Sequence, residues 1–295
     1  MGAAVVISFT YGIRRGFKLK TRKLVAAAAV AAGCLSATTS SAIAEPAWAP
    51  ADSATVHPGV QTFTEGAQCT SNFVFYDGSN NAYIGQAAHC SGTGGNTETN
   101  GCLAGSHPIG TPVEVDGATR PGTLVYNSWL TMQAKGETDP DKCAGNDFAL
   151  VKLDAADAAK TNPSIPFWGG PVGITDTTTL GETVLSYGNS SLRLGVTALS
   201  PKEGKSLGNA GENGGWTHPV YTVTPGIPGD SGSAFMNGDG QAFGVLSVLE
   251  VLPRPASNGV ADLSRALSYM RANDTAFAGI QMANGTEPFT GGNLP

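Results

Sequence analysis

Short runs of β-branched and aromatic residues, separated by turn-forming clusters, follow one another through most of the chain beyond residue 58. Examples are NFVFYDGSNNAYIG (72–85), DFALVKL (147–153), ETVLSYGNS (182–190) and QAFGVLSVLEVL (241–252). Asp77-Gly78 and Asn237-Gly238 lie between such runs, which is a strong hairpin signal. Many short strands at nearly regular spacing predict an all-β sandwich or barrel.

Amino-acid composition supports this prediction and narrows the partners. The 295 residues include 40 glycines and 18 prolines, and only 14% are charged, against about 25% in typical globular proteins. The hydrophobic fraction of 41% is enough for a core and excludes global disorder. The net charge of -6 gives no basic surface, so nucleic acid is not an expected partner.

Helical periodicity is convincing in residues 261–273, where Leu263, Leu267 and Met270 recur at steps of three and four. DAADAAK (154–160) predicts only a short helical turn, and the lysines near Asp154 and Asp157 predict a solvated face there. The end of the chain, residues 276–295, is expected to be a flexible tail.

The first 44 residues have the layout of a cleaved secretory signal. Six basic residues lie between positions 14 and 23, an alanine-rich apolar stretch spans 24–35, and Ala42-Ile43-Ala44 forms a small-residue cleavage site. The apolar stretch is too short to cross a bilayer, so a short anchor helix is the weaker alternative. We expect a secreted protein without membrane contact, with a linker or short pro-segment over the Ala/Pro-rich residues 45–58.

Cleavage after Ala44 leaves four cysteines, namely Cys69, Cys90, Cys102 and Cys143. An even number in an exported chain predicts two disulfides, for which three connectivities are possible. A zinc site is the competing interpretation, but these cysteines lack the close Cys-x-x-Cys spacing that structural zinc sites favour. We therefore expect disulfides, no metal and no cofactor.

The four histidines can be weighed individually as candidates for a general base. His57, His107 and His218 each precede a proline, which favours extended or turn backbone. His89 instead ends the apolar run YIGQAAHC, where a disulfide at Cys90 would hold the backbone beside the imidazole. A half-buried structural histidine is the ordinary alternative, but His89 is the best candidate base.

An acid that orients such a base should be buried and held by a strand. Asp147 fits this description because it begins the run DFALVKL, whose Phe148, Leu150 and Leu153 have the pattern of core residues. An isolated aspartate before a strand is usually a cap or turn residue, so Asp147 alone is a modest signal.

Ser231 lies in TPGIPGDSGSAF (224–235), a segment too rich in glycine and proline for a helix and poor as a strand. Gly229 and Gly232 allow backbone angles that other residues reach only at a cost. A turn of this kind can direct successive N–H groups toward one point, as an oxyanion hole requires. A plain Gly/Ser surface turn is the alternative.

Together, AAHC, NDFALVKL and GDSGS occur in the order His, Asp, Ser. This order and spacing resemble the chymotrypsin-like (trypsin-type) serine peptidases, particularly their secreted bacterial members, over roughly residues 69–271. An α/β-hydrolase would have the order Ser, Asp, His and a Gly-x-Ser-x-Gly elbow, whereas position 233 is serine. The resemblance implies two antiparallel six-stranded β-barrels, residues 59–165 and 166–275, with a C-terminal helix and an active site in the cleft between the barrels.

The resemblance also implies residue roles. Ser231 would be the nucleophile, His89 the general base and then acid, and Asp147 the residue that orients His89. The N–H groups of Gly229 and Ser231 would bind the developing oxyanion. Cys69 would pair with Cys90 beside the histidine, which leaves Cys102 to pair with Cys143.

The substrate pocket departs from the trypsin pattern. Lys/Arg specificity in this family needs a carboxylate six residues before the nucleophile, where this chain has Pro225. Ser247 matches the serine that precedes the substrate-binding edge, but Val248 and Leu249 follow it in place of an aromatic residue and a glycine. We expect a small or medium apolar residue on the acyl side of the cut bond.

Asp230 needs a buried cationic partner if the resemblance holds, because an unpaired buried charge is very costly. Animal members of the family supply the amine of an Ile-Val-Gly-Gly terminus, which this sequence lacks. Arg193 is a candidate for the partner, and we expect no activation of the Ile-Val type.

The sequence as a whole predicts a secreted bacterial serine endopeptidase that acts as a monomer on protein or peptide substrates. A catalytically weak or inactive homologue that binds extracellular partners is the alternative, and the unusual pocket residues are its support.

Overall fold

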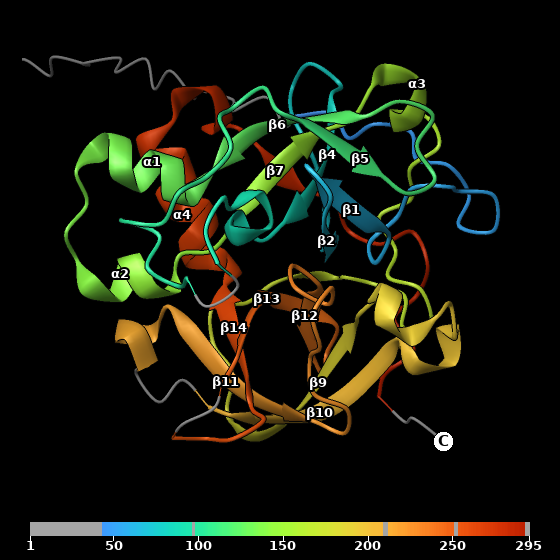
Figure 1. Cartoon of the computed structure of the whole chain (residues 1–295). Helices are drawn as coiled ribbons and strands as arrows, with labels where there is room; N and C mark the ends of the chain where they lie inside the picture. Colours follow the sequence, from blue (N-terminus) through green and yellow to red (C-terminus); the bar gives the residue numbers. More distant parts are fainter. Residues whose placement is uncertain (1–42, 96–97, 209–211, 251–252, 293–295) are drawn as a thin grey trace, which may run out of the picture. The chain divides into compact units, whose positions relative to one another are not determined.

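The structure is a computed structural model of the chain (Figure 1), and it describes residues 43–95, 98–208, 212–250 and 253–292. The predicted signal peptide, residues 1–44, lies outside the described residues except for its last two.

Eight strands form the first sheet, in the order β15-β3-β4-β7-β6-β5-β1-β2. Every neighbouring pair in this sheet is antiparallel. The strands are β1 (Gln61–Thr64), β2 (Ala67–Thr70), β3 (Val74–Tyr76), β4 (Ala82–Gln86), β5 (Pro112–Val115), β6 (Gly122–Asn127), β7 (Ala149–Lys152) and β15 (Gln281–Met282). One face buries an aliphatic cluster that includes Ile84, Leu124 and Val151.

The second sheet closes on itself, because β12 pairs with both β9 and β13. Its strands are β9 (Leu180–Tyr187), β10 (Pro201–Leu207), β11 (Thr217–Thr222), β12 (Ala234–Asn237), β13 (Gln241–Leu249) and β14 (Asn258–Asp262), with β8 (Gly173–Ile174) added in parallel to β13. Phe235, Phe243 and Val260 are among the side chains that fill this barrel.

The two strand groups lie one above the other in Figure 1, with β1 to β7 above β9 to β14. The predicted all-β fold with two antiparallel barrels is therefore confirmed. The second barrel is the closed six-stranded one, whereas the first is a curled eight-stranded sheet whose end strands β15 and β2 are not paired with each other in the described structure.

Within the described residues, four α-helices and five short 3-10 helices connect or cover the strands. They are α1 (Ser128–Lys135), α2 (Pro140–Gly145), α3 (Ala155–Ala158), α4 (Leu263–Asn273), η1 (Ala88–Ser91), η2 (Ser191–Arg193), η3 (Thr197–Leu199), η4 (Glu212–Gly215) and η5 (Thr275–Phe277). The predicted C-terminal helix is α4, which begins after Asp262 because this carboxylate accepts a hydrogen bond from Arg265 N at 2.7 Å. None of the described helices is long and apolar enough to cross a membrane.

Both ends of the described chain are held against the sheets. The stretch for which the sequence predicts a flexible tail forms β15, which pairs with β3, and Thr290 N donates to Trp168 O at 2.8 Å. In the predicted linker, Ala49 N donates to Thr161 O at 2.9 Å and Val56 is fully buried. The domain boundaries themselves remain predictions.

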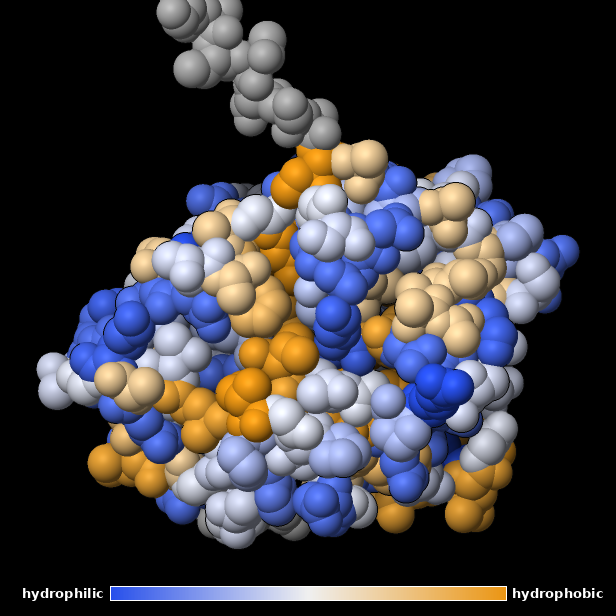
Figure 2. All heavy atoms as spheres, turned by 90° about the horizontal axis from the view of Figure 1, so that it is seen from above, coloured by the Kyte–Doolittle hydropathy of each residue, from blue (hydrophilic) through white to orange (hydrophobic). Residues whose placement is uncertain are grey.

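The face seen from above in Figure 2 mixes hydrophilic and hydrophobic residues, and the hydrophobic groups are interrupted by hydrophilic ones. Such mixing is ordinary for a protein surface. This face therefore gives no reason by itself to expect a large apolar interface.

Asp157 corrects one expectation from the sequence, because its side chain is fully buried and not part of a solvated face. The carboxylate accepts hydrogen bonds from Thr119 N at 2.9 Å, Thr119 Oγ1 at 2.8 Å and Arg120 N at 3.1 Å. Burial alone would raise the pKa of Asp157, but these hydrogen bonds outweigh it and the pKa is lowered. Asp157 thus fixes the turn between β5 and β6.

We predict that Asp157→Asn lowers the free energy of unfolding by about 2 kcal/mol at pH 7, because a neutral amide accepts these bonds less well. A lowered folded-state pKa contributes stability above the unfolded value of about 3.9, and this contribution is lost as pH falls through the folded value. Urea unfolding from pH 7 to pH 3 should therefore show a smaller acid loss in the variant. Asp116→Asn, at an exposed position, is the control, and equal effects would contradict the prediction.

Candidate active site

His89 and Asp147 are in direct contact at one edge of the first sheet. His89 lies in η1 directly after β4, and Asp147 lies just before β7, which pairs with β4. The imidazole Nδ1 is 2.6 Å from Asp147 Oδ2, and the backbone N–H of His89 donates to Asp147 Oδ1 at 2.9 Å. The carboxylate therefore fixes both the ring and the backbone of the histidine.

Ser247 of β13 joins this pair from the second barrel. Its hydroxyl donates to Asp147 Oδ2 at 2.6 Å. Burial alone would raise the pKa of Asp147, but the charge and hydrogen bonds of His89 and the Ser247 hydroxyl outweigh it, so the pKa is lowered. Asp147 is therefore held ionised by groups from both sheets.

The same pair sets the proton affinity of His89. Burial alone would lower the pKa of His89, but the charge of Asp147 and its hydrogen bond raise it above the ordinary value. The side chain of His89 is 24% exposed, against 4% for Asp147, so the imidazole can reach a substrate while the carboxylate stays covered.

Ser231 lies in the loop between β11 and β12, and several hydrogen bonds attach this loop to the first sheet. Ser231 O accepts from Thr70 N at 2.8 Å, and Gly232 O accepts from the Asn72 side chain at 3.0 Å. A Cβ atom at Gly232, where φ is +86°, would lie 3.0 Å from Ala87 N. The serine backbone is thus packed against the segment that leads into His89.

The three predicted site residues are not equally connected. The structure joins His89 to Asp147 directly, but within the described residues it has no hydrogen bond between the Ser231 hydroxyl and His89. Such contacts are often long in proteins without substrate and tighten when substrate binds.

Some backbone N–H groups of the Ser231 loop donate hydrogen bonds within the protein and others do not. Those of Asp230, Gly232 and Ser233 donate to the carbonyls of Ile227, Leu246 and Asp230. In contrast, the N–H groups of Gly229 and Ser231 donate to no protein acceptor in the described structure. Two free donors on either side of one residue can bind a single anionic oxygen.

Hydrogen bonds to the carbonyls of the same peptides fix the direction of these two donors. The C=O and N–H of a trans peptide point in opposite directions. Pro228 O accepts from Ser190 Oγ at 2.5 Å, which directs the Gly229 N–H away from that hydroxyl. Asp230 O accepts from Ser233 N at 3.1 Å, which directs the Ser231 N–H away from the Ser233 amide.

Asp230 is fully buried, and the structure identifies its partners. Arg193 forms a two-point ion pair with it, through Nη1 to Oδ1 and through Nη2 at 2.6 Å from Oδ2. Lys202 Nζ lies 3.3 Å from Oδ2. Burial alone would raise the pKa of Asp230, but the Arg193 hydrogen bonds and the Lys202 charge outweigh it and lower the pKa.

The Arg193 candidate is therefore confirmed as a partner, whereas sequence reasoning missed Lys202. In PKEGKSL (201–207) this lysine alternates with other charged and small residues, as on an exposed strand. No signal in that pattern singles it out from Lys205.

The expected pocket residues lie along β13 and the start of the serine loop. Val248 packs toward β14, where a Cβ atom at Gly259 would be 2.6 Å from its Cγ2. Leu249 is 48% exposed, so its side chain is not buried within the barrel. Pro225 O accepts a hydrogen bond from Lys202 Nζ at 3.1 Å.

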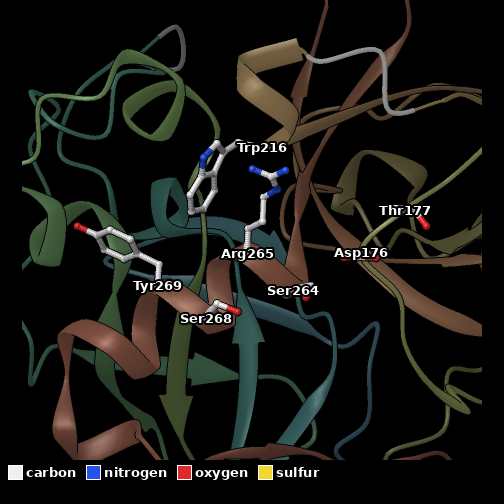
Figure 3. Close-up of a pocket in the computed structure, with 7 residues that line it drawn as sticks. All are labelled: Asp176, Thr177, Trp216, Ser264, Arg265, Ser268 and Tyr269. Atoms are coloured by element: carbon white, nitrogen blue, oxygen red, sulfur yellow. The ribbon is translucent and has the colours of Figure 1, made fainter. Parts of the chain in front are cut away.

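A separate groove of about 460 Å³ lies beside α4 and contains none of the predicted site residues (Figure 3). Its lining consists of Asp176, Thr177, Trp216, Ser264, Arg265, Ser268 and Tyr269. The Arg265 guanidinium lies 6.0 Å from the centre of the Trp216 ring, which it covers as a cation–π contact.

Both disulfides are present, as Cys69–Cys90 and Cys102–Cys143. The sulfur atoms of Cys69 and Cys90 lie within 4.8 Å of a ring nitrogen of His89, a grouping that could suggest a metal site. A disulfide sulfur is not a thiolate, so these cysteines are unsuited as zinc ligands. Instead, the bond clamps β2 to the His89 segment.

No protein-family model matches the chain, and no curated protein matches it. Protease A of Thermobifida fusca resembles it at a TM-score of 0.48 and 17% identity, over 78% of this chain and 99% of that one. A glutamic acid-specific serine protease gives 0.48 and 16% identity over 77% and 100%, and the chymotrypsin of Cellulomonas bogoriensis gives 0.46 and 18% over 77% and 98%. These identities are too low to carry any residue's role across.

The topology itself defines the class of fold. A curled antiparallel sheet that contributes His89 and Asp147, a closed barrel that contributes Ser231, and a C-terminal helix together make the chymotrypsin-like fold.

Proposed function

We propose that this protein is a secreted serine endopeptidase that cuts peptide bonds through an acyl-enzyme on Ser231. The observation that carries the proposal is the geometry around the serine. An ionised, buried Asp147 holds His89, and the loop that packs against the histidine segment carries two free N–H donors, those of Gly229 and of Ser231 itself. Nucleophilic acyl transfer needs these three elements.

In the proposed acylation step, Ser231 Oγ attacks the carbonyl carbon of the substrate while His89 Nε2 accepts the hydroxyl proton. The N–H groups of Gly229 and Ser231 bind the carbonyl oxygen as it becomes an anion. The C–N bond then breaks, and the leaving amine takes the proton from His89. Water repeats the sequence on the acyl-enzyme and releases the acid.

Asp147 contributes by keeping the proton of neutral His89 on Nδ1, which leaves Nε2 free to accept the proton from serine. Its negative charge also stabilises the imidazolium that forms in each step. The Ser247 hydroxyl and the backbone N–H of His89 hold the carboxylate in this orientation.

The proposal further includes export, a monomer, and protein or peptide substrates, without nucleic acid, metal or cofactor. Disulfides such as Cys69–Cys90 persist in oxidising compartments, which supports export.

A catalytically weak or inactive binding protein is the second candidate. Two observations favour it: Ser231 has no hydrogen bond to His89 among the described residues, and Leu249 occupies the position where related pockets have glycine. Reactivity of the serine distinguishes the two functions.

We predict that a fluorophosphonate probe labels the secreted protein and that Ser231→Ala abolishes labelling. Peptide hydrolysis in this variant should fall by a factor on the order of 10⁴ to 10⁶, because the nucleophile is lost. Ser264→Ala, on α4, is the matched control and should label normally. Labelling that persists without Ser231, or none in the wild type, would favour the binding protein.

The raised pKa of His89 predicts the acid side of the pH profile. Because the imidazole must be neutral to accept a proton, kcat/KM should fall as pH decreases through a value above the ordinary histidine pKa of about 6.5. Asp147→Asn should move this midpoint to lower pH and reduce kcat by a factor on the order of 10⁴. A wild-type midpoint below 6 would contradict the assignment of His89 as base.

Pro225 and Leu249 predict the substrate preference. A panel of peptides that differ only in the residue before the cut bond should be cleaved best at small or medium apolar residues. Pro225 offers no carboxylate for Lys or Arg, and Leu246 already lies against Gly226, where an added Cβ would be 2.8 Å from its Cδ2. A preference for Lys or Arg would refute this prediction.

A further inference from the structure

Lys202 is a lysine whose side chain is completely buried beside the serine loop. Its Nζ donates to Thr224 O at 3.0 Å and to Pro225 O at 3.1 Å, and it lies 3.3 Å from Asp230 Oδ2. One ammonium group therefore contacts both the beginning of the loop and the residue just before Ser231.

Charge neutralisation does not explain this burial. Arg193 already pairs with Asp230 at two points, so Lys202 leaves the buried group with one positive charge in excess. Burying an ammonium is costly unless its hydrogen bonds are satisfied, and here backbone carbonyls supply them. What the buried ammonium does is fix the positions of the Thr224 and Pro225 carbonyls.

The stretch that Lys202 holds is itself immobilised from a second side. Thr222 Oγ1 donates to Thr224 O at 2.8 Å, and Gly226 N donates to Asn258 Oδ1 at 2.7 Å. Asn258 is buried in β14. These contacts tie the pocket backbone to the barrel, whereas Lys202 ties it to Asp230 and so to the serine.

We propose that Lys202 is a positioning residue that holds the substrate-pocket backbone at Thr224 and Pro225 in register with the Ser231 loop. This inference rests on the proposed peptidase function. A substrate side chain that enters the pocket then places its scissile carbonyl at the Gly229 and Ser231 donors. Without the ammonium, the pocket and the nucleophile would each persist, but their relative placement would be looser.

The proposal includes a dependence on alkaline pH, because only the charged ammonium donates all of these bonds. Burial lowers the pKa of Lys202, the charge of Asp230 opposes that shift, and the charge of Arg193 adds to it. Asp230 and Arg193 are the charged groups that face Lys202. As the pH rises, Lys202 should therefore lose its proton, and with it some of these hydrogen bonds, at a pH below the ordinary pKa range of lysine.

The test compares Lys202→Met with Lys205→Met, two lysines on the same strand. Lys205 is exposed, and its Nζ donates to Thr183 Oγ1 at 2.9 Å on the neighbouring strand. Lys202→Met leaves the neutral Arg193–Asp230 pair, so the variant is expected to fold. Active-site titration corrects both variants for the fraction of competent protein.

Two reactions are measured on each protein. One is kcat/KM for a peptide with an apolar residue before the cut bond, and the other is the rate of inactivation by diisopropyl fluorophosphate, which has no group for the pocket. Lys202→Met should lower kcat/KM by a factor on the order of 10 to 100, mainly through kcat, since misplacing the reacting atoms by about 1 Å can cost that much. Inactivation should change less than about threefold, and Lys205→Met should change neither.

Equal losses in both reactions, or no loss in either, would overturn the proposal. Failure of the wild type to react with diisopropyl fluorophosphate would instead refute the proposed function.

The wild type provides a second measurement that does not depend on folding of the variant. Its ratio of peptide kcat/KM to inactivation rate should fall between pH 8 and pH 10.5. A ratio that stays constant over this range would also overturn the proposal.

Discussion

The arrangement of this site depends on the hydrogen bonds that the Asp147 carboxylate accepts. It accepts hydrogen bonds from the backbone and ring of His89 and from the hydroxyl of Ser247. His89 belongs to the first sheet and Ser247 to the second, so one buried charge joins them. His89 contacts both carboxylate oxygens and Ser247 adds a third hydrogen bond, which matters because an unsatisfied buried charge would be strongly destabilising.

A second buried carboxylate, Asp230, organises the serine loop by the same principle. Arg193 and Lys202 both pair with it, and Ser190 N and Ile227 N donate to its two oxygens at 3.1 Å. The cations that pair with this carboxylate both come from within the chain, Arg193 from η2 and Lys202 from β10.

Much of the site could be predicted from sequence because its evidence is local. The small residues around His89, the strand that follows Asp147 and the glycines around Ser231 each carry a signal within a few residues. The all-β fold was predictable for the same reason, from short runs and turn signals.

What the sequence did not disclose depends on partners far along the chain. The sequence around Lys202 has the pattern of an exposed strand, and only the contact with Asp230 distinguishes this lysine from its neighbours. Asp157 lies three residues before Lys160, a spacing that predicts a solvated face. The two side chains do pair at 3.4 Å, but Thr119 and Arg120 enclose the carboxylate. The C-terminal segment pairs with β3, more than 200 residues earlier, and no local pattern reveals that pairing.

The hydrogen bonds that attach the Ser231 loop to the first sheet make the position of the serine depend on both strand groups. Thr70 N holds Ser231 O, and the Asn72 amide holds Gly232 O, although all four groups lie outside the interior of the second barrel. The strand pairings that close the second barrel do not include these bonds, so the position of Ser231 depends on contact with β2 as well. The placement of Ser231 beside the His89 segment therefore requires both strand groups to be folded, and unfolding of either one would disturb it.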